Sequence, residues 1–174
     1  MEEASPLQRE IRQGKPFRSR SQEVVVALLR TTDLVRRHLG RVLEPFDITP
    51  QQYNVLRILR GAGEQGLPTL EIGERMIEQA PGITRLLDRL EAKALVRRER
   101  CPHDRRQVLC WLTPAGAELV ERLDQPIDAA DAEAVAMLGP EEQEKLLRFL
   151  DLVRSRTIDS QPDAYQQNPS GGNS

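Results

Sequence analysis

Two arginines and a threonine share the polar side of one predicted helix. The helix starts near Pro81 and ends near Lys93, and its aliphatic residues occupy about 100° of the circumference at about 100° per residue. Thr84, Arg85 and Arg89 lie outside that arc. Arginine can hold O6 and N7 of guanine with two hydrogen bonds, and threonine can contact the methyl group of thymine. The pattern predicts contacts in a DNA major groove, and the alternative is a solvated helix whose arginines pair locally.

A second basic cluster lies at the tip of a predicted hairpin. Two short strands, residues 95–100 and 107–112, are joined by the segment Cys101-Pro-His-Asp-Arg-Arg106. A narrow minor groove concentrates negative potential and attracts an inserted arginine. An aspartate two positions before an arginine can hold its guanidinium in place. We therefore predict that Asp104, Arg105 and Arg106 contact DNA.

Other chemistries have little support among the residues. The glycines at positions 61, 63 and 66 are not followed by the Lys-Ser/Thr pair of a phosphate-binding loop. Cys101 and His103 alone are not a metal-ligand set, and neither histidine has an evident nucleophile partner. Arginines near Cys101 would favour its thiolate, so a redox role for Cys101 or Cys110 stays open beside unreactive thiols. We expect no enzymatic activity, no metal and no cofactor.

The elements around these clusters can be placed from periodicity and capping residues. Apolar residues at spacings of three and four predict a helix over residues 21–43, which Pro45 ends. Thr49, Thr69 and Thr113 are candidate N-caps, and proline follows the first and the last of them. The further helices are expected over residues 50–61, 69–77, 81–93, 114–138 and 140–158, with a short extended piece at 67–68.

This order predicts a mainly α fold with a small β wing. Two short helices in tandem followed by a basic hairpin form a winged helix-turn-helix lobe, here about residues 49–113. Residues 21–43 and 114–158 carry apolar stripes that such a lobe cannot cover, which predicts dimerisation helices. We expect residues 1–20 to be a flexible basic arm and residues 159–174, rich in Gln, Asn, Pro, Ser and Gly, to be a disordered tail.

Charge is segregated along the chain, although the net charge is only −2. Residues 75–106 hold nine Lys and Arg against five Asp and Glu, whereas residues 118–151 hold ten acids and three bases. This segregation gives the central region an electrostatic footprint suited to DNA. The chain shows no apolar run of ~18 residues, no secretory signal and too few cysteines for a disulfide framework. We expect a cytoplasmic protein without membrane association.

One stretch carries a family pattern: Gly82-Ile-Thr-Arg-Leu-Leu-Asp-Arg-Leu-Glu-Ala-Lys93, then Leu95-Val-Arg-Arg98, Asp104-Arg-Arg106 and Leu112-Thr-Pro-Ala-Gly116. It resembles the multiple-antibiotic-resistance regulators, the MarR family, and the likeness extends over about residues 24–156. The resemblance implies a triangular homodimer with winged DNA-binding lobes, interlocked terminal helices and a palindromic operator. It also implies that Arg106 enters the minor groove with Asp104 as its holder, and that Thr84, Arg85 and Arg89 are groove contacts.

Two residues depart from the family pattern. Ala94 stands where the family commonly has glycine, and a left-handed alanine would cost about 1 kcal/mol. Pro126 lies inside a predicted helix and should kink or break it. The family is often regulated by a small molecule in the cleft between the lobes and the dimer helices. Tyr53, Arg57 and His38 would lie at such a cleft, although packing explains Tyr53 equally well, and the chemistry of the effector is unknown.

The sequence predicts a DNA-binding transcription regulator. In its specific form, it is a repressor that binds a palindromic operator in double-stranded DNA as a homodimer and responds to a small-molecule effector. The alternative is a winged-helix protein–protein interaction module that no longer binds DNA. The arginines at positions 85, 89 and 106 favour the first interpretation.

Overall fold

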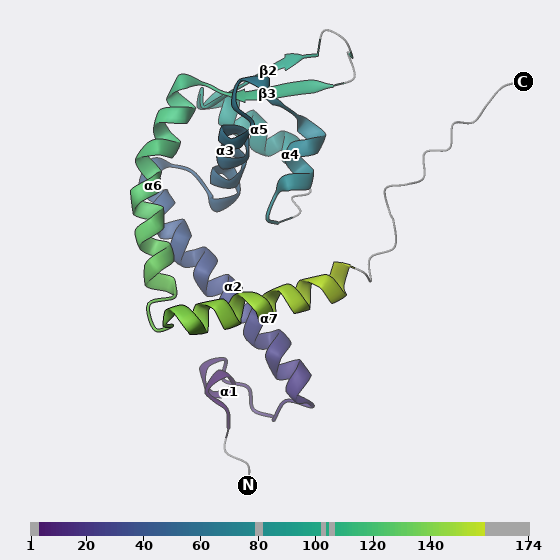
Figure 1. The fold of residues 1–174 in the computed structure, drawn as a ribbon, viewed down its shortest axis with the longest axis vertical. Helices are drawn as coiled ribbons and strands as arrows, with labels where there is room; N and C mark the ends of the chain where they lie inside the picture. The colour runs from purple at the N-terminus through teal and green to yellow at the C-terminus, as the bar shows by residue number, and fades with distance from the viewer. Residues whose placement is uncertain (1–3, 79–81, 102–103, 105–106, 159–174) are drawn as a thin grey trace, which may run out of the picture. The chain divides into compact units, whose positions relative to one another are not determined.

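The computed structural model describes residues 4–78, 82–101, 104 and 107–158, and the chain forms two compact units that divide between Ala134 and Val135. In chain order, the first unit contains α1 (Pro6–Glu10), α2 (Arg20–Leu43), the 3-10 helix η1 (Glu44–Phe46), α3 (Pro50–Ala62), the 3-10 helix η2 (Gly63–Gln65), β1 (Leu67–Pro68), α4 (Thr69–Arg75), α5 (Ile83–Ala92), β2 (Val96–Arg100), β3 (Val108–Leu112) and α6 (Pro114–Ala134) (Figure 1). The second unit contains α7 (Pro140–Ile158). The predicted mainly α fold with a small β wing is confirmed.

The three strands form one antiparallel sheet in the order β1-β3-β2. β2 pairs with β3 along its whole length, and Leu67 of β1 pairs with Cys110 of β3. Successive side chains of a strand point to opposite faces of a sheet. Val96 and Cys110 are therefore buried on the inner face, while Arg97 and Trp111 lie on the outer face.

The core of the winged lobe, α3 to β3, lies between this sheet and the helices α3, α4 and α5. Its most deeply buried side chains come from all of these elements: Val55, Leu56, Leu59, Ile72, Leu87, Leu90, Val96 and Cys110. α3 starts as predicted, with Pro50 in its first turn. The Thr49 hydroxyl accepts a hydrogen bond from the Gln52 amide, and the Gln52 side chain accepts one from the Thr49 amide.

Thr69 does not cap α4, which corrects the prediction made from the sequence. The helix begins at Thr69 itself, and no side chain caps it. The Thr69 hydroxyl instead donates a hydrogen bond to the carbonyl of Val108 in β3, at 3.2 Å. A strand that follows 39 residues later in the chain supplies this partner, so the local sequence could not reveal it.

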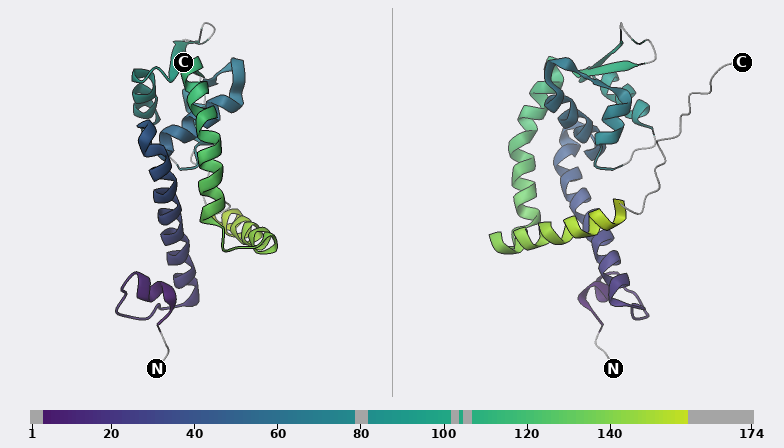
Figure 2. Two further views of the ribbon diagram at one scale, coloured as in Figure 1. Left: turned by 90° about the vertical axis from the view of Figure 1, so that its left-hand side faces the viewer. Right: turned by 45° about the vertical axis from the view of Figure 1, so that its right-hand side comes forward.

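The long helices α2 and α6 pack against each other through the C-terminal half of α2, while the N-terminal half extends away from the winged lobe (Figure 2). His38 Nε2 of α2 lies 3.1 Å from the carbonyl oxygen of Ala130 in α6. The predicted break at Pro126 is wrong, because α6 is continuous through this residue. An interior proline costs about 3 kcal/mol. Burial of Leu123 and Ile127 on either side offsets this cost.

The N-terminal arm contains a short helix that its composition did not predict. Ser5 caps α1, its hydroxyl accepting a hydrogen bond from the Gln8 amide at 3.2 Å. Arg30 of α2 donates to the Glu10 carboxylate at 2.7 Å and joins the two helices. The expectation of a wholly flexible arm is therefore corrected for these residues. An isolated helix of this length is unstable in water, so the contact with α2 supports it.

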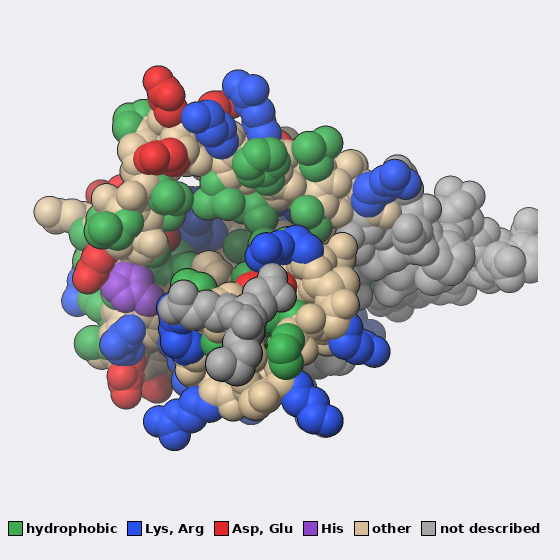
Figure 3. Space-filling model, turned by 90° about the horizontal axis from the view of Figure 1, so that it is seen from below, with side chains coloured by type: hydrophobic (Ala, Val, Ile, Leu, Met, Phe, Trp, Pro, Cys, Tyr) green, Lys and Arg blue, Asp and Glu red, His purple; other side chains and the backbone are tan. Residues whose placement is uncertain are grey.

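Large apolar side chains remain uncovered on both predicted dimerisation segments. Leu147, Phe149 and Leu152 of α7 are each more than half exposed, and so are Val25 and Leu29 of α2. The surface in Figure 3 shows hydrophobic side chains lying exposed among charged ones. Across the part of the chain that is described, no helix is long and apolar enough to cross a membrane.

A left-handed alanine follows the C-terminus of α5. Ala94 has φ of +54°. Its amide donates to the carbonyl of Glu91 at 2.8 Å, and the Leu95 amide donates to the carbonyl of Leu90 at 3.0 Å. These two bonds form a Schellman motif, whose left-handed position is usually glycine. Ala94 therefore adopts the left-handed conformation considered from the sequence, and its side chain bears the steric cost of that conformation.

We expect Ala94→Gly to raise the free energy of unfolding by about 1 kcal/mol, because it relieves that cost. Urea titrations at one fixed protein concentration would measure the change. The matched control is Ala92→Gly in the last turn of α5, which should lower stability by roughly 0.5–1 kcal/mol. Equal destabilisation by both substitutions would contradict the account of this cap.

Candidate nucleic-acid interface

The residues of α5 divide between a buried and an exposed face. The buried residues are Leu86, Leu87 and Leu90, and the exposed ones are Thr84, Arg85, Asp88, Arg89 and Ala92. Burial of three leucines on the core fixes the rotation of the helix about its axis. The structure therefore places the three side chains predicted to enter the groove together on the solvent-facing side of one helix.

Arg85 and Arg89 do not pair locally. Asp88, which lies between them in sequence, bonds to Arg98 of β2 at 2.7 Å instead. Considering only residues with a described placement, the side chains of Arg85 and Arg89 make no hydrogen bond and no ion pair. Their charges are available to an anionic partner.

The basic side of α5 continues at its C-terminal end. Arg89 and Lys93 border a groove of about 440 Å³ next to the start of α3, where Thr49 and Gln52 also line it. The Lys93 ammonium is 2.8 Å from the carboxylate of Asp47. This pairing holds Lys93 at the end of the helix, close to the groove that Arg89 borders.

The chain segment between α4 and α5 is held by two neighbouring helices. The Ile77 amide donates to Asn54 Oδ1 of α3 at 2.9 Å. The next carboxylate, Glu78, lies 3.2 Å from Arg36 Nη1 of α2 and accepts a hydrogen bond from Gln51 Nε2 of α3 at 3.3 Å. α2 and α3 therefore fix where the helix-turn-helix leaves α4.

The wing is closed at the base of its tip. The Cys101 amide donates to the carbonyl of Gln107, and the Gln107 amide donates to the carbonyl of Asp104, both at 2.9 Å. Arg105 and Arg106 lie outside the described residues, and so does the predicted contact between Arg106 and Asp104. The roles of these three residues stay predictions.

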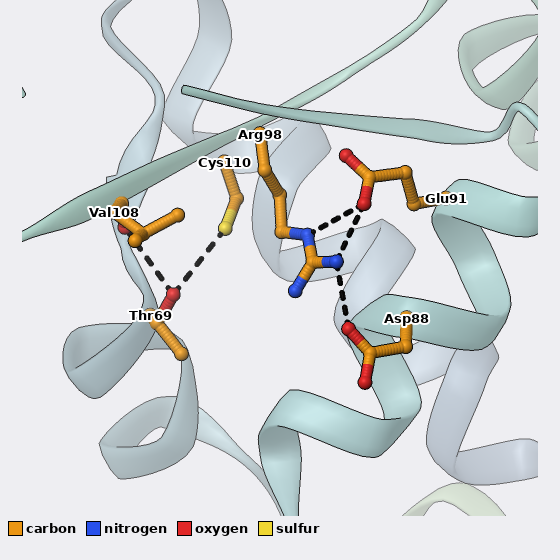
Figure 4. A network of polar contacts seen from close by, with 6 residues as sticks. All are labelled: Thr69, Asp88, Glu91, Arg98, Val108 and Cys110. Carbon is orange, nitrogen blue, oxygen red and sulfur yellow. Dashed lines mark hydrogen bonds and ion pairs between the residues drawn. The ribbon is translucent and has the colours of Figure 1, made fainter. Parts of the chain in front are cut away.

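Arg98 forms a polar network beneath the wing that the sequence analysis missed (Figure 4). Its guanidinium donates to the Glu91 carboxylate through Nε at 3.0 Å and through Nη2 at 2.5 Å, and to Asp88 through Nη2 at 2.7 Å. Its hydrogen bonds with Glu91 and then Asp88 raise the pKa of Arg98 above its ordinary value. The sequence holds one signal for this network, the alternation of side chains along a strand. Arg98 is two residues after Val96 and so shares its buried face.

The outer face of the sheet is anchored by Trp111. The indole Nε1 donates to the Glu64 carbonyl at 3.1 Å, and the Arg97 guanidinium stacks 4.1 Å from the ring centroid. Gly66 has φ of +67°, and a Cβ there would lie 2.4 Å from Trp111 Nε1. Only glycine fits beside the indole, so the loop after α3 and strand β3 are locked together.

The residues considered for an effector cleft serve packing in this structure. Tyr53 is buried in the core, with the Arg57 guanidinium 6.0 Å from its ring centroid. Burial raises the pKa of the Tyr53 hydroxyl. His38 bonds to α6 at Ala130 and lies 3.5 Å from Glu133. These contacts join α2, α3 and α6 and identify no ligand chemistry.

The two cysteines have different surroundings, and neither belongs to a metal site among the described residues. Cys110 is fully buried, and burial raises the pKa of its thiol. Its Sγ lies 3.6 Å from the Thr69 hydroxyl. Cys101 is half-buried at the start of the wing tip. The thiolate required for redox chemistry is disfavoured at Cys110.

Comparison with known proteins finds relatives of one family. A model of the MarR family matches residues 46–107. The transcriptional regulator HosA of Escherichia coli O111:H- is 33% identical over 108 residues, covering 62% of this chain and 76% of HosA. The crystal structure of a MarR transcription factor from Planctomyces limnophilus is similar with a TM-score of 0.62 at 37% identity, covering 79% of this chain and 99% of that one. A cysteine-to-serine mutant of MarR from E. coli, complexed with operator DNA, gives a TM-score of 0.70 at 29% identity and covers 86% and 99%.

We expect the two thiols to differ in their reaction with a maleimide at neutral pH. Cys101 should be modified within minutes, and Cys110 at least about a hundredfold more slowly, because its thiol is buried and its pKa is raised. Peptide mass spectrometry would locate the adduct, with Cys101→Ser as the matched control. Rapid labelling of Cys110 in the folded control would contradict its burial.

Proposed function

Since this chain belongs to the MarR family of DNA-binding, winged-helix transcription regulators, we propose that it is a repressor. Its homodimer binds a palindromic operator in double-stranded DNA, and a small molecule releases it. The family consists of transcription regulators rather than enzymes, and we assign the chain no catalytic activity or cofactor. Its site of action under this proposal is the cytoplasm, where the chromosome lies.

The exposed face of α5 carries this proposal. Thr84, Arg85 and Arg89 project from one helix, and both arginines lack a partner among the residues described. A helix fits the major groove and reads base edges with its N-terminal residues, and arginine at this position can grip guanine. An interaction module without DNA binding would have no need for two unneutralised arginines on this face.

The wing supplies the second proposed contact. β2 and β3 lead to the tip that contains Asp104, Arg105 and Arg106. We assign Arg106 to the minor groove, with Asp104 holding its guanidinium, and Arg105 to the neighbouring sugar-phosphate backbone of the DNA. Insertion of an arginine there senses the width and potential of the groove rather than base identity.

The dimer is proposed from the uncovered apolar surface of α2 and α7, with α6 joining them to the lobe. Exposed Leu, Val and Phe side chains on helices of this length are typical of an interface that another chain covers. Each lobe then reaches one half-site, and the half-sites lie about 10 bp apart, one turn of DNA. The effector would bind in the cleft expected between the lobe and the dimerisation helices α2 and α6, and would shift that spacing.

A direct test is a mobility shift of purified protein on DNA taken from beside its own gene, followed by nuclease protection. We expect a protected palindrome and an affinity that falls steeply with salt, because arginines displace counterions from phosphates. Binding that is absent at low salt, with the protein folded and dimeric, would favour the interaction module instead.

Charge placed on the dimer surface should separate the subunits. Leu147 is 56% exposed in the single chain, so Leu147→Glu should leave the helices folded and shift micromolar protein towards monomer in sedimentation velocity. Leu70→Glu on α4 is the matched control, since Leu70 is 68% exposed but lies in the lobe. DNA affinity should fall as the dimer is lost. A monomeric wild type, or an intact Leu147→Glu dimer, would contradict the assigned interface.

Substitutions in the two reading elements should have different signatures. Arg106→Ala should weaken binding to all operators and lower the salt dependence, while preference among variants of the major-groove half-site stays unchanged. Arg85→Ala should cost about 1–3 kcal/mol and relax preference at specific positions. Titrations of both proteins against an operator panel at two salt concentrations measure these effects. Wild-type affinity in Arg106→Ala would overturn the wing assignment, and uniform weakening by Arg85→Ala would place that arginine on phosphate.

A further inference from the structure

Arg98 lies beneath the wing and reaches both carboxylates of α5. Its side chain, 21% exposed, leaves β2 on the same face as buried Val96. Figure 4 shows the guanidinium between the strand and the helix, directed at Glu91 and Asp88. The three hydrogen bonds, at 2.5, 2.7 and 3.0 Å, all use the Nε and Nη2 donors. This edge of the guanidinium is therefore committed to α5.

The same side of the sheet also holds α4. Cys110 stands opposite Arg98 in the strand register, and its Sγ contacts the Thr69 hydroxyl, which in turn donates to the Val108 carbonyl. Each helix of the helix-turn-helix is thus joined to the wing by a side chain, α4 through Thr69 and α5 through Arg98. The wing and the two helices are connected on their inner side.

The position of Asp88 makes its pairing important. On a helical wheel it lies about 60° from Arg85 and about 40° from Thr84, within the exposed face. A free carboxylate there would repel DNA phosphates and would compete for the guanidinium of Arg85. Arg98 forms an ion pair with Asp88 from the inner side of the helix, so that Asp88 does not pair with Arg85. Arg85 therefore has no partner among the described side chains.

We infer that Arg98 is a positioning residue for DNA binding, one that fixes α5 against wing strand β2 through Glu91 and Asp88. The helix and the hairpin then meet DNA in a single relative orientation. This role rests on the proposed function. A guanidinium suits it, because its planar fork can serve two carboxylates at once, whereas the ammonium of lysine is a point charge.

A direct contact between Arg98 and a DNA phosphate is the rival explanation for any role of Arg98 in DNA binding. Removal of its partner Glu91 separates this explanation from positioning. Glu91→Met takes a negative charge away from a helix that faces DNA, so electrostatics alone predicts tighter binding. Positioning predicts the opposite, because Arg98 loses its principal anchor on α5. Glu99→Met is the matched control, since Glu99 lies on the outer face of the same strand and pairs with Arg97 at 2.5 Å.

The experiment measures operator affinity of the full-length protein by titration at two salt concentrations. The variants are Arg98→Met, Arg98→Lys, Glu91→Met, the double variant Arg98→Met/Glu91→Met, and Glu99→Met. Stoichiometric titration gives the DNA-binding fraction of each preparation, and melting curves establish that each variant is folded at the assay temperature. Arg98→Lys serves as the second probe if Arg98→Met does not fold.

We expect Arg98→Met and Glu91→Met each to weaken binding at least fivefold, with the double variant no more than about twofold worse than Arg98→Met. Arg98→Lys should still bind the operator at least fivefold more weakly than wild type, and Glu99→Met should bind it as tightly as wild type or more tightly. Unchanged or tighter binding by Glu91→Met, or full rescue by lysine, would overturn the inference. A wild-type protein that binds no operator would instead refute the proposed function.

Discussion

Unpaired arginines on the exposed face of α5 require that the carboxylates of the same helix be paired elsewhere. α5 carries two acids beside its two arginines, and an unpaired Asp88, three residues after Arg85, would pair with that arginine on the helix surface. In this protein, Arg98 of β2 holds both acids from beneath, at 2.5–3.0 Å. The basic face of α5 thus depends on a contact between two elements, and a change in the wing strand alters the charge that the helix presents.

Two glycines allow the rest of the lobe to close around this contact. A Cβ on Gly116 would lie 2.1 Å from the carbonyl oxygen of Leu95, the same oxygen to which the Thr113 amide donates at 3.1 Å. A Cβ on Gly66 would meet the indole of Trp111. The start of α6 therefore packs directly on the chain that follows α5, and the loop after α3 packs directly on β3. Close backbone approach at both places holds the sheet rigidly against the helices.

Much of this fold follows from local sequence rules, and the departures have a common cause. Periodicity and capping predict α2, α3 and α5 closely, since Thr49 caps its own helix and the leucines of α5 face the core. Thr69 and Arg98 find partners in elements distant in sequence, which no local pattern encodes. α1 is joined to α2 by the ion pair of Glu10 with Arg30, and α6 continues through Pro126 between buried neighbours. Tertiary contacts override local preference in each of these cases.

The lobe and the helices beneath it are joined by polar contacts at separate points. Arg60 of α3 forms two 2.8 Å hydrogen bonds with the Asp124 carboxylate of α6, and this pairing lowers the pKa of Asp124. Arg36 of α2 reaches Glu78, where the chain leaves α4. In the proposed dimer, the distance between the two α5 helices is then set by α2 and α6 rather than by a flexible linker. A ligand that moved either helix would act on the lobe through these contacts with α3 and with the end of α4, which gives the proposed effector a mechanical route to the operator.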